Sequence, residues 1–283
     1  MKSKVVVILG QTATGKSDLA VRIARKIGGE VISADSRQVY KNLDIGTGKI
    51  TFREMRDVPH HLLDIADPKK QFTVAEYKKL ALEKITEIVE RGKIPIICGG
   101  TGFYIDAIVN GTIFPNVAPN DKLRIKLIGK SVIQLFLILK KLDQRRAKNI
   151  DSKNKVRLIR AIEIAKTLGK VPQIKEVKPM YKFIKVGLYL SPDKLRKKVE
   201  KRVKKMFRDG LKNEIKKMKK SGISQKRLKG FGFEYFNPTP EKIVRETLKY
   251  AKRQMTWFKR DKEIKWFSNS SSVLAWLQKS LAK

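Results

Sequence analysis

The chain has few cysteines, histidines and acidic side chains, and it has no long apolar run. Cys98 is the only cysteine in 283 residues, which excludes an internal disulfide framework and a CxxC metal site. The only histidines, His60 and His61, have no cysteine partner, so we interpret them as a structural turn rather than a zinc site. The N-terminal run Val5–Leu9 is far shorter than the roughly 20 apolar residues of a membrane-spanning helix. We therefore expect an intracellular, cytoplasmic protein that does not enter a membrane.

The small number of acidic residues is the most informative of these shortages. Lys and Arg number 65 against 27 Asp and Glu, which gives a formal net charge of +38. A surface with this charge repels itself unless a polyanion binds it, and nucleic acids are among the commonest polyanions in cells. A lysine-rich proteome is the alternative explanation. The lysine pairs between residues 197 and 220 have the same two interpretations, a solvated face or a phosphate-binding face.

Buried strands alternate with helices in the first hundred residues. Strands are predicted at Val5–Leu9, Glu30–Ser33 and Lys93–Cys98, because each is a short and mostly apolar segment that leads into a turn. Apolar residues at helical spacing predict helices at Ser17–Ile27 and Phe72–Arg91. Strands that alternate with helices of this length indicate right-handed β-α-β units and a parallel sheet.

The pattern changes after Gly111, where a connection that contains proline and asparagine leads into basic helices. Four helical regions and one returning strand follow: helices Lys122–Asp143, Lys153–Leu168, Pro192–Ser221 and Glu241–Arg260, and strand Phe183–Leu190. We therefore expect an α/β core of residues 1–111 and 151–283, with a parallel sheet flanked by helices. A small helical insertion is expected at residues 112–150.

The sharpest motif is GQTATGKS, which matches the pattern GxxxxGK[ST] and lies between a predicted strand and a predicted helix. Backbone N–H groups in such a loop point at phosphate oxygens, and the helix start adds its positive dipole end. Lys16 is predicted to bind the outer phosphate, and the Ser17 hydroxyl is placed to hold Mg²⁺. The predicted phosphate-binding residues are Gly10, Gln11, Thr12, Ala13, Thr14, Gly15, Lys16 and Ser17. The motif alone fits ATP and an organic diphosphate equally well.

Two further segments follow predicted strands and so reach the same edge of the sheet. Asp35 is placed to hold Mg²⁺ or to accept a proton, and capping a turn is its alternative role. The segment Gly99–Gly102 combines glycines, which allow a ligand to approach the backbone closely, with the hydroxyl of Thr101. The sequence therefore predicts one site built from three strand ends.

Taken in order, six segments resemble the tRNA dimethylallyltransferases, also called tRNA isopentenyltransferases or IPP transferases. The segments are GQTATGKS, ISADSRQVYKNLDIGTGK, VPHHLLDIADP, PIICGGTGFY, VRLIRAIEIAKTLGK and AKRQMTWFKR, and they cover most of residues 4–111 and 153–260. A plain P-loop kinase would share only the first segment. The resemblance implies a P-loop-kinase-like fold with a helical insertion, which we expect to contact the anticodon arm of tRNA.

The family transfers a dimethylallyl group from dimethylallyl diphosphate to N6 of the adenosine 3′ of the anticodon, with Mg²⁺ as cofactor. The resemblance therefore implies two partners, dimethylallyl diphosphate and the anticodon stem-loop of tRNA, and we expect a monomer. N6 is a poor nucleophile because its lone pair is delocalised into the purine, so the amine needs a base and the diphosphate needs stabilisation as it leaves. Asp35 is the carboxylate available as that base, and Lys16 with the loop amides and Mg²⁺ stabilises the diphosphate.

Residue roles that follow from motif position complete the expected site. The implied catalytic residues are Thr12, Lys16, Asp35 and Thr101. Residues expected to contact tRNA are Asp35, Ser36, Arg37, Gln38, Thr101, Arg124, Val156, Arg157, Leu158, Ile159, Arg160, Lys252 and Arg253. Because the adenosine must leave its stack to reach such a site, a channel lined by basic residues is expected.

The sequence departs from the family pattern at three places. Gln11 replaces a usual proline, at a position that contributes only backbone. Glu234 is acidic where the late G-Y-[KR] segment of the family is basic, and the insertion is shorter than expected. Two alternatives stay open on the sequence: a P-loop kinase that acts on a small metabolite, and a catalytically inactive RNA-binding P-loop protein. The intact P-loop argues against the second.

Overall fold

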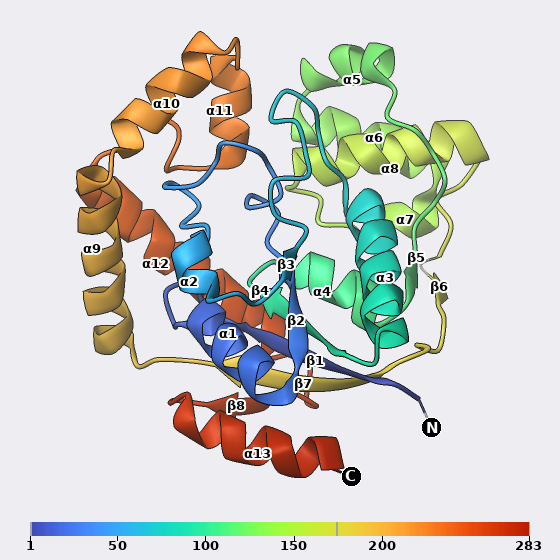
Figure 1. Ribbon diagram of the computed structural model, residues 1–283. Coiled ribbons are helices and arrows are strands. Elements are labelled where there is room, and N and C mark those ends of the chain that lie inside the picture. Colours follow the sequence, from blue (N-terminus) through green and yellow to red (C-terminus); the bar gives the residue numbers. More distant parts are fainter. Residues whose placement is uncertain (1, 174, 283) are drawn as a thin grey trace. The chain divides into compact units, whose positions relative to one another are not determined.

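The computed structural model describes residues 2–173 and 175–282, which form two compact units (Figure 1). The larger unit contains Met1–Gly111 and Lys178–Lys283, and the smaller unit contains Thr112–Val177. The smaller unit begins where the sequence predicts the insertion, but it ends at Val177 rather than at residue 150. The difference arises because helix α8 (Lys155–Leu168), which the sequence analysis places in the core, packs inside the smaller unit.

A parallel sheet, six-stranded over the described residues, forms the centre of the larger unit. Its strands in spatial order are β3 (His60–His61), β2 (Gly29–Ala34), β4 (Ile94–Gly99), β1 (Lys4–Gly10), β7 (Lys182–Leu188) and β8 (Lys265–Phe267). All neighbouring strands run parallel, as the alternation of strands and helices predicts. Strand β1 lies between β4 and β7, and Val6 pairs with Ile96 on one side and Ile184 on the other.

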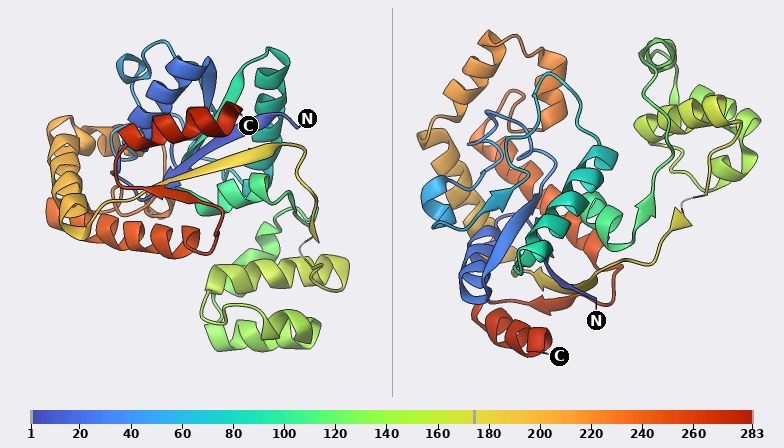
Figure 2. Two further views of the ribbon diagram at one scale, coloured as in Figure 1. Left: turned by 90° about the horizontal axis from the view of Figure 1, so that it is seen from below. Right: turned by 45° about the vertical axis from the view of Figure 1, so that its right-hand side comes forward.

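Helices cover both faces of this sheet, which explains why its strands are apolar throughout. Val5 and Val7 of β1 enter the core on one face, while Val6 and Ile8 enter the core on the other. The face that carries Val6 is covered by α1 (Lys16–Ile27) and α13 (Ser271–Ala282) (Figure 2). The opposite face is covered by α3 (Val74–Glu90), α4 (Gly102–Val109), α9 (Pro192–Arg208) and α12 (Pro240–Phe258).

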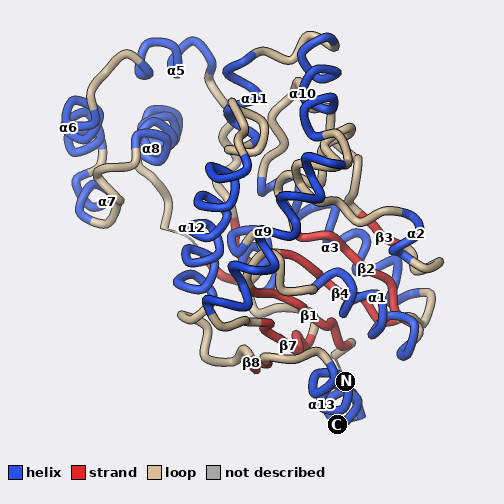
Figure 3. Tube along the Cα trace, turned by 90° about the vertical axis from the view of Figure 1, so that its left-hand side faces the viewer, coloured by secondary structure: helices blue, strands red, loops and turns tan. Residues whose placement is uncertain are grey.

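Helices α9 and α12 pack side by side (Figure 3). They bring residues from the last third of the chain close to the ends of the strands. Along the chain they are joined by α10 (Leu211–Lys220) and α11 (Gln225–Phe231). The predicted basic region Pro192–Ser221 is therefore two helices. They separate at Gly210, whose φ of 101° cannot continue an α-helix.

Helix α12 illustrates the amphipathic character of these long helices. It spans 19 residues, and its buried stripe includes Ile243, Ala251 and Phe258, while lysines and arginines occupy its exposed side. A charged face of this kind belongs in water. Within the described part of the chain, no helix is long and apolar enough to cross a bilayer.

The smaller unit is a helical bundle closed by a short antiparallel pair. Its elements are β5 (Thr112–Ile113), α5 (Asp121–Ile128), α6 (Val132–Leu142), α7 (Gln144–Lys148), α8 and β6 (Lys175–Glu176). The core contains Leu135 and Leu139 of α6 together with Leu158 of α8. The predicted single helix Lys122–Asp143 is two helices, because Ser131 begins α6 with a capping box.

Candidate active site

The loop between β1 and α1 has the geometry of a phosphate-binding loop. Gly10 ends β1 with a φ of 130°, and a Cβ there would lie 2.2 Å from the carbonyl oxygen of Leu188 on β7. Only glycine therefore fits between the two strands. The loop then enters the N-terminus of α1, where free N–H groups and the positive end of the helix dipole favour an anion.

Lys16 and Ser17 open helix α1 and line a cavity of about 570 Å³ in the larger unit. The Lys16 Nζ donates to the carbonyl oxygen of Gln11, so the ammonium lies over its own loop. Burial lowers the pKa of Lys16 to about 8. A bound diphosphate would favour the charged form again, because an opposite charge nearby raises the pKa of an ammonium.

Asp35 follows β2 and lines the same cavity. Its Oδ1 accepts hydrogen bonds from the N–H of Arg37 at 2.9 Å and from the N–H of Gln38 at 3.3 Å. The two bonds fix both the turn and the orientation of the carboxylate, and Oδ2 takes no part in them. Capping a turn and serving as a proton acceptor are therefore compatible roles for Asp35.

Thr101 joins the ends of β2 and β4 rather than facing the cavity. Its N–H donates to the carbonyl oxygen of Ala34 at 3.1 Å, and its hydroxyl accepts from the N–H of Ser36 at 3.0 Å. The Tyr250 side chain on α12 also bonds to Thr101, and burial raises the pKa of Tyr250 to about 12. Thr101 therefore supports the turn that carries Asp35.

Gly99 ends β4 and Gly100 follows it; both line the cavity, but the space beside each of them is filled by protein. A Cβ on Gly99 would lie 2.1 Å from the carbonyl oxygen of Ala34, and one on Gly100 would lie 2.2 Å from Nε2 of Gln254. The approach of a ligand to these glycines stays a prediction. The structure shows a further role: they let β2 and α12 pack closely against this loop.

Arg202 lines the cavity and was missed by the sequence analysis. It lies on α9, where its guanidinium donates to the carbonyl oxygen of Thr47 at 2.7 Å and lies 3.4 Å from the hydroxyl of Thr12. Burial lowers the pKa of Arg202. The sequence signal that could have identified Arg202 is its position, because it lies beside the apolar stripe of this helix that includes Val199 and Val203.

Gln254 on α12 is a second residue that the sequence analysis missed. Its Oε1 accepts from the N–H of Thr12 at 2.8 Å, and its Nε2 donates to the carbonyl oxygen of Gly100 at 2.9 Å. The side chain is buried and thus ties the P-loop to the loop after β4. A polar residue on the buried stripe of α12, between Ala251 and Phe258, was the available sign.

Comparisons with known proteins agree with this geometry. Residues 38–261 match the sequence model of the family described as IPP transferase. The chain belongs to the IPP transferase family. It is 38% identical to the tRNA dimethylallyltransferase of Pelotomaculum thermopropionicum, over 94% of this chain and 90% of that protein.

Two solved structures are similar to this member of the IPP transferase family. The tRNA isopentenylpyrophosphate transferase of Bacillus halodurans has a TM-score of 0.73 and 36% identity, over 99% of this chain and 96% of that one. A eukaryotic dimethylallyltransferase acting on tRNA has a TM-score of 0.82 and 27% identity, over 94% of this chain and 74% of that one. These similarities confirm the predicted family and α/β fold, and they favour a transferase over a metabolite kinase or an inactive RNA-binding protein.

The residues expected to contact tRNA in this IPP transferase belong to different parts of the chain. Arg37 and Gln38 line the cavity with Asp35. Lys252 and Arg253 line a separate hollow on the exposed side of α12. Arg124 and the residues numbered 156–160 belong to the smaller unit.

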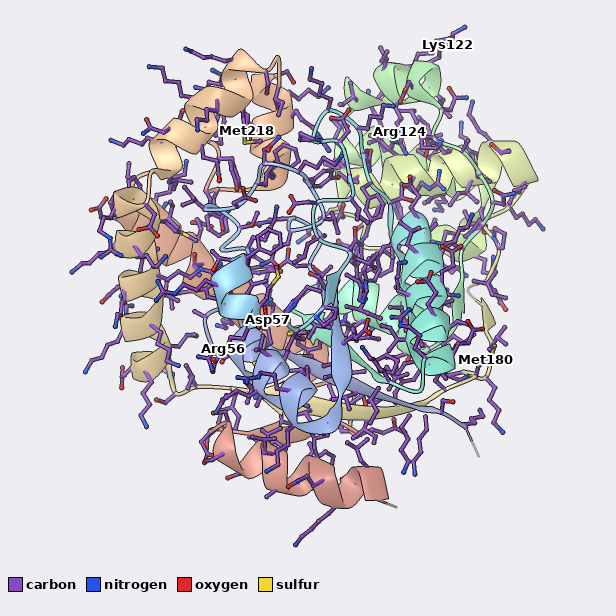
Figure 4. The ribbon with its side chains drawn as sticks, in the orientation of Figure 1. Arg56, Asp57, Lys122, Arg124, Met180 and Met218 are labelled. Atoms are coloured by element: carbon purple, nitrogen blue, oxygen red, sulfur yellow. The ribbon has the colours of Figure 1, made fainter. Side chains whose placement is uncertain are left out.

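In the smaller unit, Arg124 on α5 (Figure 4) is bound by Glu163, with Nε–Oε1 and Nη2–Oε2 distances of 2.6 and 2.9 Å. Arg160 donates to the same carboxylate at 2.9 Å. Val156 is 77% exposed, whereas Leu158 is fully buried in the core of the unit. The expectation of an RNA contact is therefore wrong for the side chain of Leu158, because that side chain holds α8 on α6.

A Mg²⁺ ion would find few protein ligands in the cavity. The Ser17 hydroxyl is exposed at the start of α1. Among the residues that the structure describes, no group of three or more His, Cys, Asp or Glu side chains could hold a metal. Mg²⁺ usually binds through one or two protein oxygens together with water and substrate phosphates. A Mg²⁺ ion in this cavity would therefore take most of its ligands from a diphosphate and water, and the Ser17 hydroxyl is a protein oxygen that could hold it.

Proposed function

We propose that this chain transfers a dimethylallyl group from dimethylallyl diphosphate to N6 of the adenosine immediately 3′ of a tRNA anticodon. The observation that carries the proposal is a single cavity lined by the cations Lys16 and Arg202 and by the carboxylate of Asp35. Such a cavity can bind a leaving anion and accept a proton in the same space. The names of the curated relatives, tRNA dimethylallyltransferases, support the same reaction.

The cations of the cavity act on the leaving group. As the C1–O bond of the donor breaks, its electron pair leaves with the diphosphate. Lys16, Arg202 and the N–H groups of the P-loop stabilise this growing negative charge, and they do so more strongly in the transition state than in the ground state. A Mg²⁺ ion held by Ser17 and the diphosphate would supply further charge neutralisation at those oxygens.

Asp35 acts on the acceptor. A bond forms between N6 and C1, and the proton that N6 then carries in excess goes to the Asp35 carboxylate. The N–H groups of Arg37 and Gln38 hold the carboxylate in place during this transfer. Thr101 is a positioning residue in this scheme, because it fixes the turn through Ser36.

Apolar side chains in the same cavity suit the dimethylallyl group. Val203 and Met206 of α9 line it together with Phe233. Contact with these side chains would bury the branched five-carbon chain and exclude water from C1. Excluding water matters because hydrolysis competes with transfer whenever the allylic bond loosens.

Basic surfaces outside the cavity are proposed to bind the tRNA. On α12, Lys252 and Arg253 line a hollow with Trp257 and Arg260, and the Arg260 guanidinium lies 4.1 Å from the centre of the Trp257 ring. Cations beside an aromatic ring suit phosphates and unstacked bases. We propose that the smaller unit contacts the anticodon arm through its exposed basic residues.

The test is incubation with an unmodified tRNA transcript and isotopically labelled dimethylallyl diphosphate, followed by nucleoside analysis. Label is expected in N6-dimethylallyladenosine, without a requirement for ATP. The matched control is a transcript in which guanosine replaces the target adenosine, and it should stay unlabelled. Transfer of the γ-phosphate of ATP to a small acceptor, with no prenylation of tRNA, would contradict the proposal and establish a kinase.

A further inference from the structure

We propose that Glu234 and Arg37 form a positioning pair that holds the Asp35 carboxylate in its reactive orientation. The inference rests on the proposed function, since it assigns Asp35 as the base. The resemblance described above predicts a basic residue at position 234, where the chain has Glu234. The structure shows the partner of this carboxylate, and the partner suggests its role.

Glu234 is a buried carboxylate directly paired with an arginine. It is 7% exposed, and its Oε2 accepts from Nη1 of Arg37 at 2.7 Å. Both side chains line the cavity that contains Asp35. The Arg37 side chain is 25% exposed, so the buried carboxylate depends on the pair more than the guanidinium does, because an unpaired carboxylate is poorly solvated there.

The Arg37 guanidinium is enclosed by the segment after α11 and by α12. The rings of Phe233 and Tyr250 lie 5.4 and 5.6 Å from its central carbon. A Cβ on Gly232 would lie only 2.7 Å from that carbon, so the backbone at Gly232 passes close beside it. Together with Glu234, these contacts commit the Arg37 side chain to the protein rather than to an RNA phosphate.

The backbone of Arg37 carries this restraint to Asp35. The N–H of Arg37 donates to Oδ1 of Asp35 at 2.9 Å, which is the shorter of the two bonds that orient the carboxylate. A side chain fixed at its guanidinium limits the movement of its own backbone. Glu234 thus acts on Asp35 through Arg37, and it needs no contact with either substrate.

The pair also balances charge around the base. Cations outnumber carboxylates in the lining of the cavity, which includes Lys16, Arg37 and Arg202 against Asp35 and Glu234. Without Glu234, the Arg37 guanidinium would be left with Asp35 as its neighbouring anion and would draw that carboxylate toward itself. Asp35 would then be turned away from the geometry that suits the proton of N6.

The first test compares Glu234→Gln with wild type in steady-state kinetics. Because a small misplacement of a reacting group is costly, kcat should fall by on the order of ten- to a hundredfold. The KM for each substrate should stay within about twofold, since the proposal gives the pair a role in positioning Asp35 and none in substrate binding. The matched control is Glu30→Gln, which removes another buried carboxylate that pairs with Arg91 and His61. It should lower the melting temperature and leave kcat unchanged.

A double variant keeps the test valid if Glu234→Gln folds poorly. Arg37→Met/Glu234→Met removes both charges together, so neither member of the pair is left without its partner. The double variant should cost no more in kcat than Arg37→Met alone, because the two residues act as one unit. Independent losses that multiply in the double variant would overturn the proposal.

Hydrogen exchange separates this proposal from the proposed function. In Glu234→Gln, the amides of Arg37 and Gln38 should exchange faster than in wild type, whatever the enzyme's substrate. If wild type prenylates tRNA but the variant keeps its kcat and its amide protection, only the pairing proposal fails. If wild type fails to prenylate tRNA, the proposed function fails, and unchanged exchange at the two amides would still overturn the pairing.

Discussion

Two glycine-containing loops lie at the ends of neighbouring parallel strands of the sheet. Both have a glycine packed tightly against protein, but only the first also has a glycine with free space beside it: nothing lies within 4 Å of a Cβ on Gly15. After β1, the P-loop leads into the start of α1 and lines the cavity, so the amides at the helix start can meet an anion, whereas the Thr12 N–H is bonded to Gln254. After β4, the space beside Gly99 and Gly100 is taken by Ala34 and Gln254. A glycine motif at a strand end therefore indicates close approach, and only the surroundings decide whether ligand or protein approaches.

Substitution of Asp35, which lies between the two loops along the chain, should have the largest effect on turnover. Asp35→Asn keeps the shape of the side chain and removes its basicity, so turnover should fall by about 10²- to 10⁴-fold. Affinity for tRNA should change little, because a base acts in the transition state more than in ground-state binding. Turnover, tRNA affinity and melting temperature are measured on the same variant at two Mg²⁺ concentrations. Full activity in a stable variant would end the assignment, and rescue by Mg²⁺ would make Asp35 a metal ligand.

The P-loop should give the next largest effect. Lys16→Ala removes a fixed positive charge from the leaving diphosphate, and turnover should fall by on the order of 10²-fold or more. The melting temperature should stay close to that of wild type, since Lys16 bonds only to its own loop at Gln11. Pre-steady-state turnover and thermal unfolding are the two measurements. Wild-type turnover in the folded variant would mean that this loop does not serve the diphosphate.

The pH dependence of kcat/KM for dimethylallyl diphosphate should follow the protonation of Lys16. Because burial lowers the pKa of Lys16 to about 8, the ammonium is charged below that pH and loses its charge above it. The kcat/KM for the donor should therefore fall by about tenfold per pH unit above pH 8. A pH profile of Lys16→Ala supplies the control, since this alkaline limb should be missing there. A limb that persists in the variant belongs to another group.

A substitution in the loop after β4 should have the smallest effect on turnover and a clear effect on the free energy of unfolding. Gly100→Ala would place a methyl group against Gln254, and overpacking of this kind costs about 1–3 kcal/mol in the free energy of unfolding. Denaturant unfolding measures the loss. Gly230→Ala is the matched control, because no atom lies within 4 Å of a Cβ there. Equal free energies of unfolding for the two variants would show that the loop accommodates a methyl group at Gly100.

The parts of the fold that depend on local pattern could be predicted closely. Strand β1 was expected at Val5–Leu9 and spans Lys4–Gly10, and helix α3 was expected at Phe72–Arg91 and spans Val74–Glu90. In both places neighbouring residues determine the element. The end of the insertion at Val177 was not predictable in this way, because the apolar residues of α8 fit either unit until their contacts are known.

The candidate site was predictable only where it is built from strand ends. The P-loop and Asp35 follow their strands directly, so the parallel order of the sheet brings them to one edge. Arg202 and Gln254 come from helices α9 and α12, and Glu234 comes from the turn after α11. All three lie more than 150 residues farther along the chain than Asp35. Their place depends on how α9 and α12 cross the sheet, which no local spacing records. In the sequence, Arg202 and Gln254 stand out only as polar residues at positions where the helical pattern predicts an apolar one. Glu234 stands out only as an acidic residue where the resemblance predicts a basic one.

The central place of β1 has a consequence for how the protein is made. Its partner β4 is synthesised early, but its other partner, β7, comes from Lys182–Leu188, after the whole smaller unit. Until the ribosome has released β7, one side of β1 is an apolar edge with unpaired backbone groups, which is a template for aggregation. A nascent chain that pauses before residue 182 would therefore be the form that most needs a chaperone.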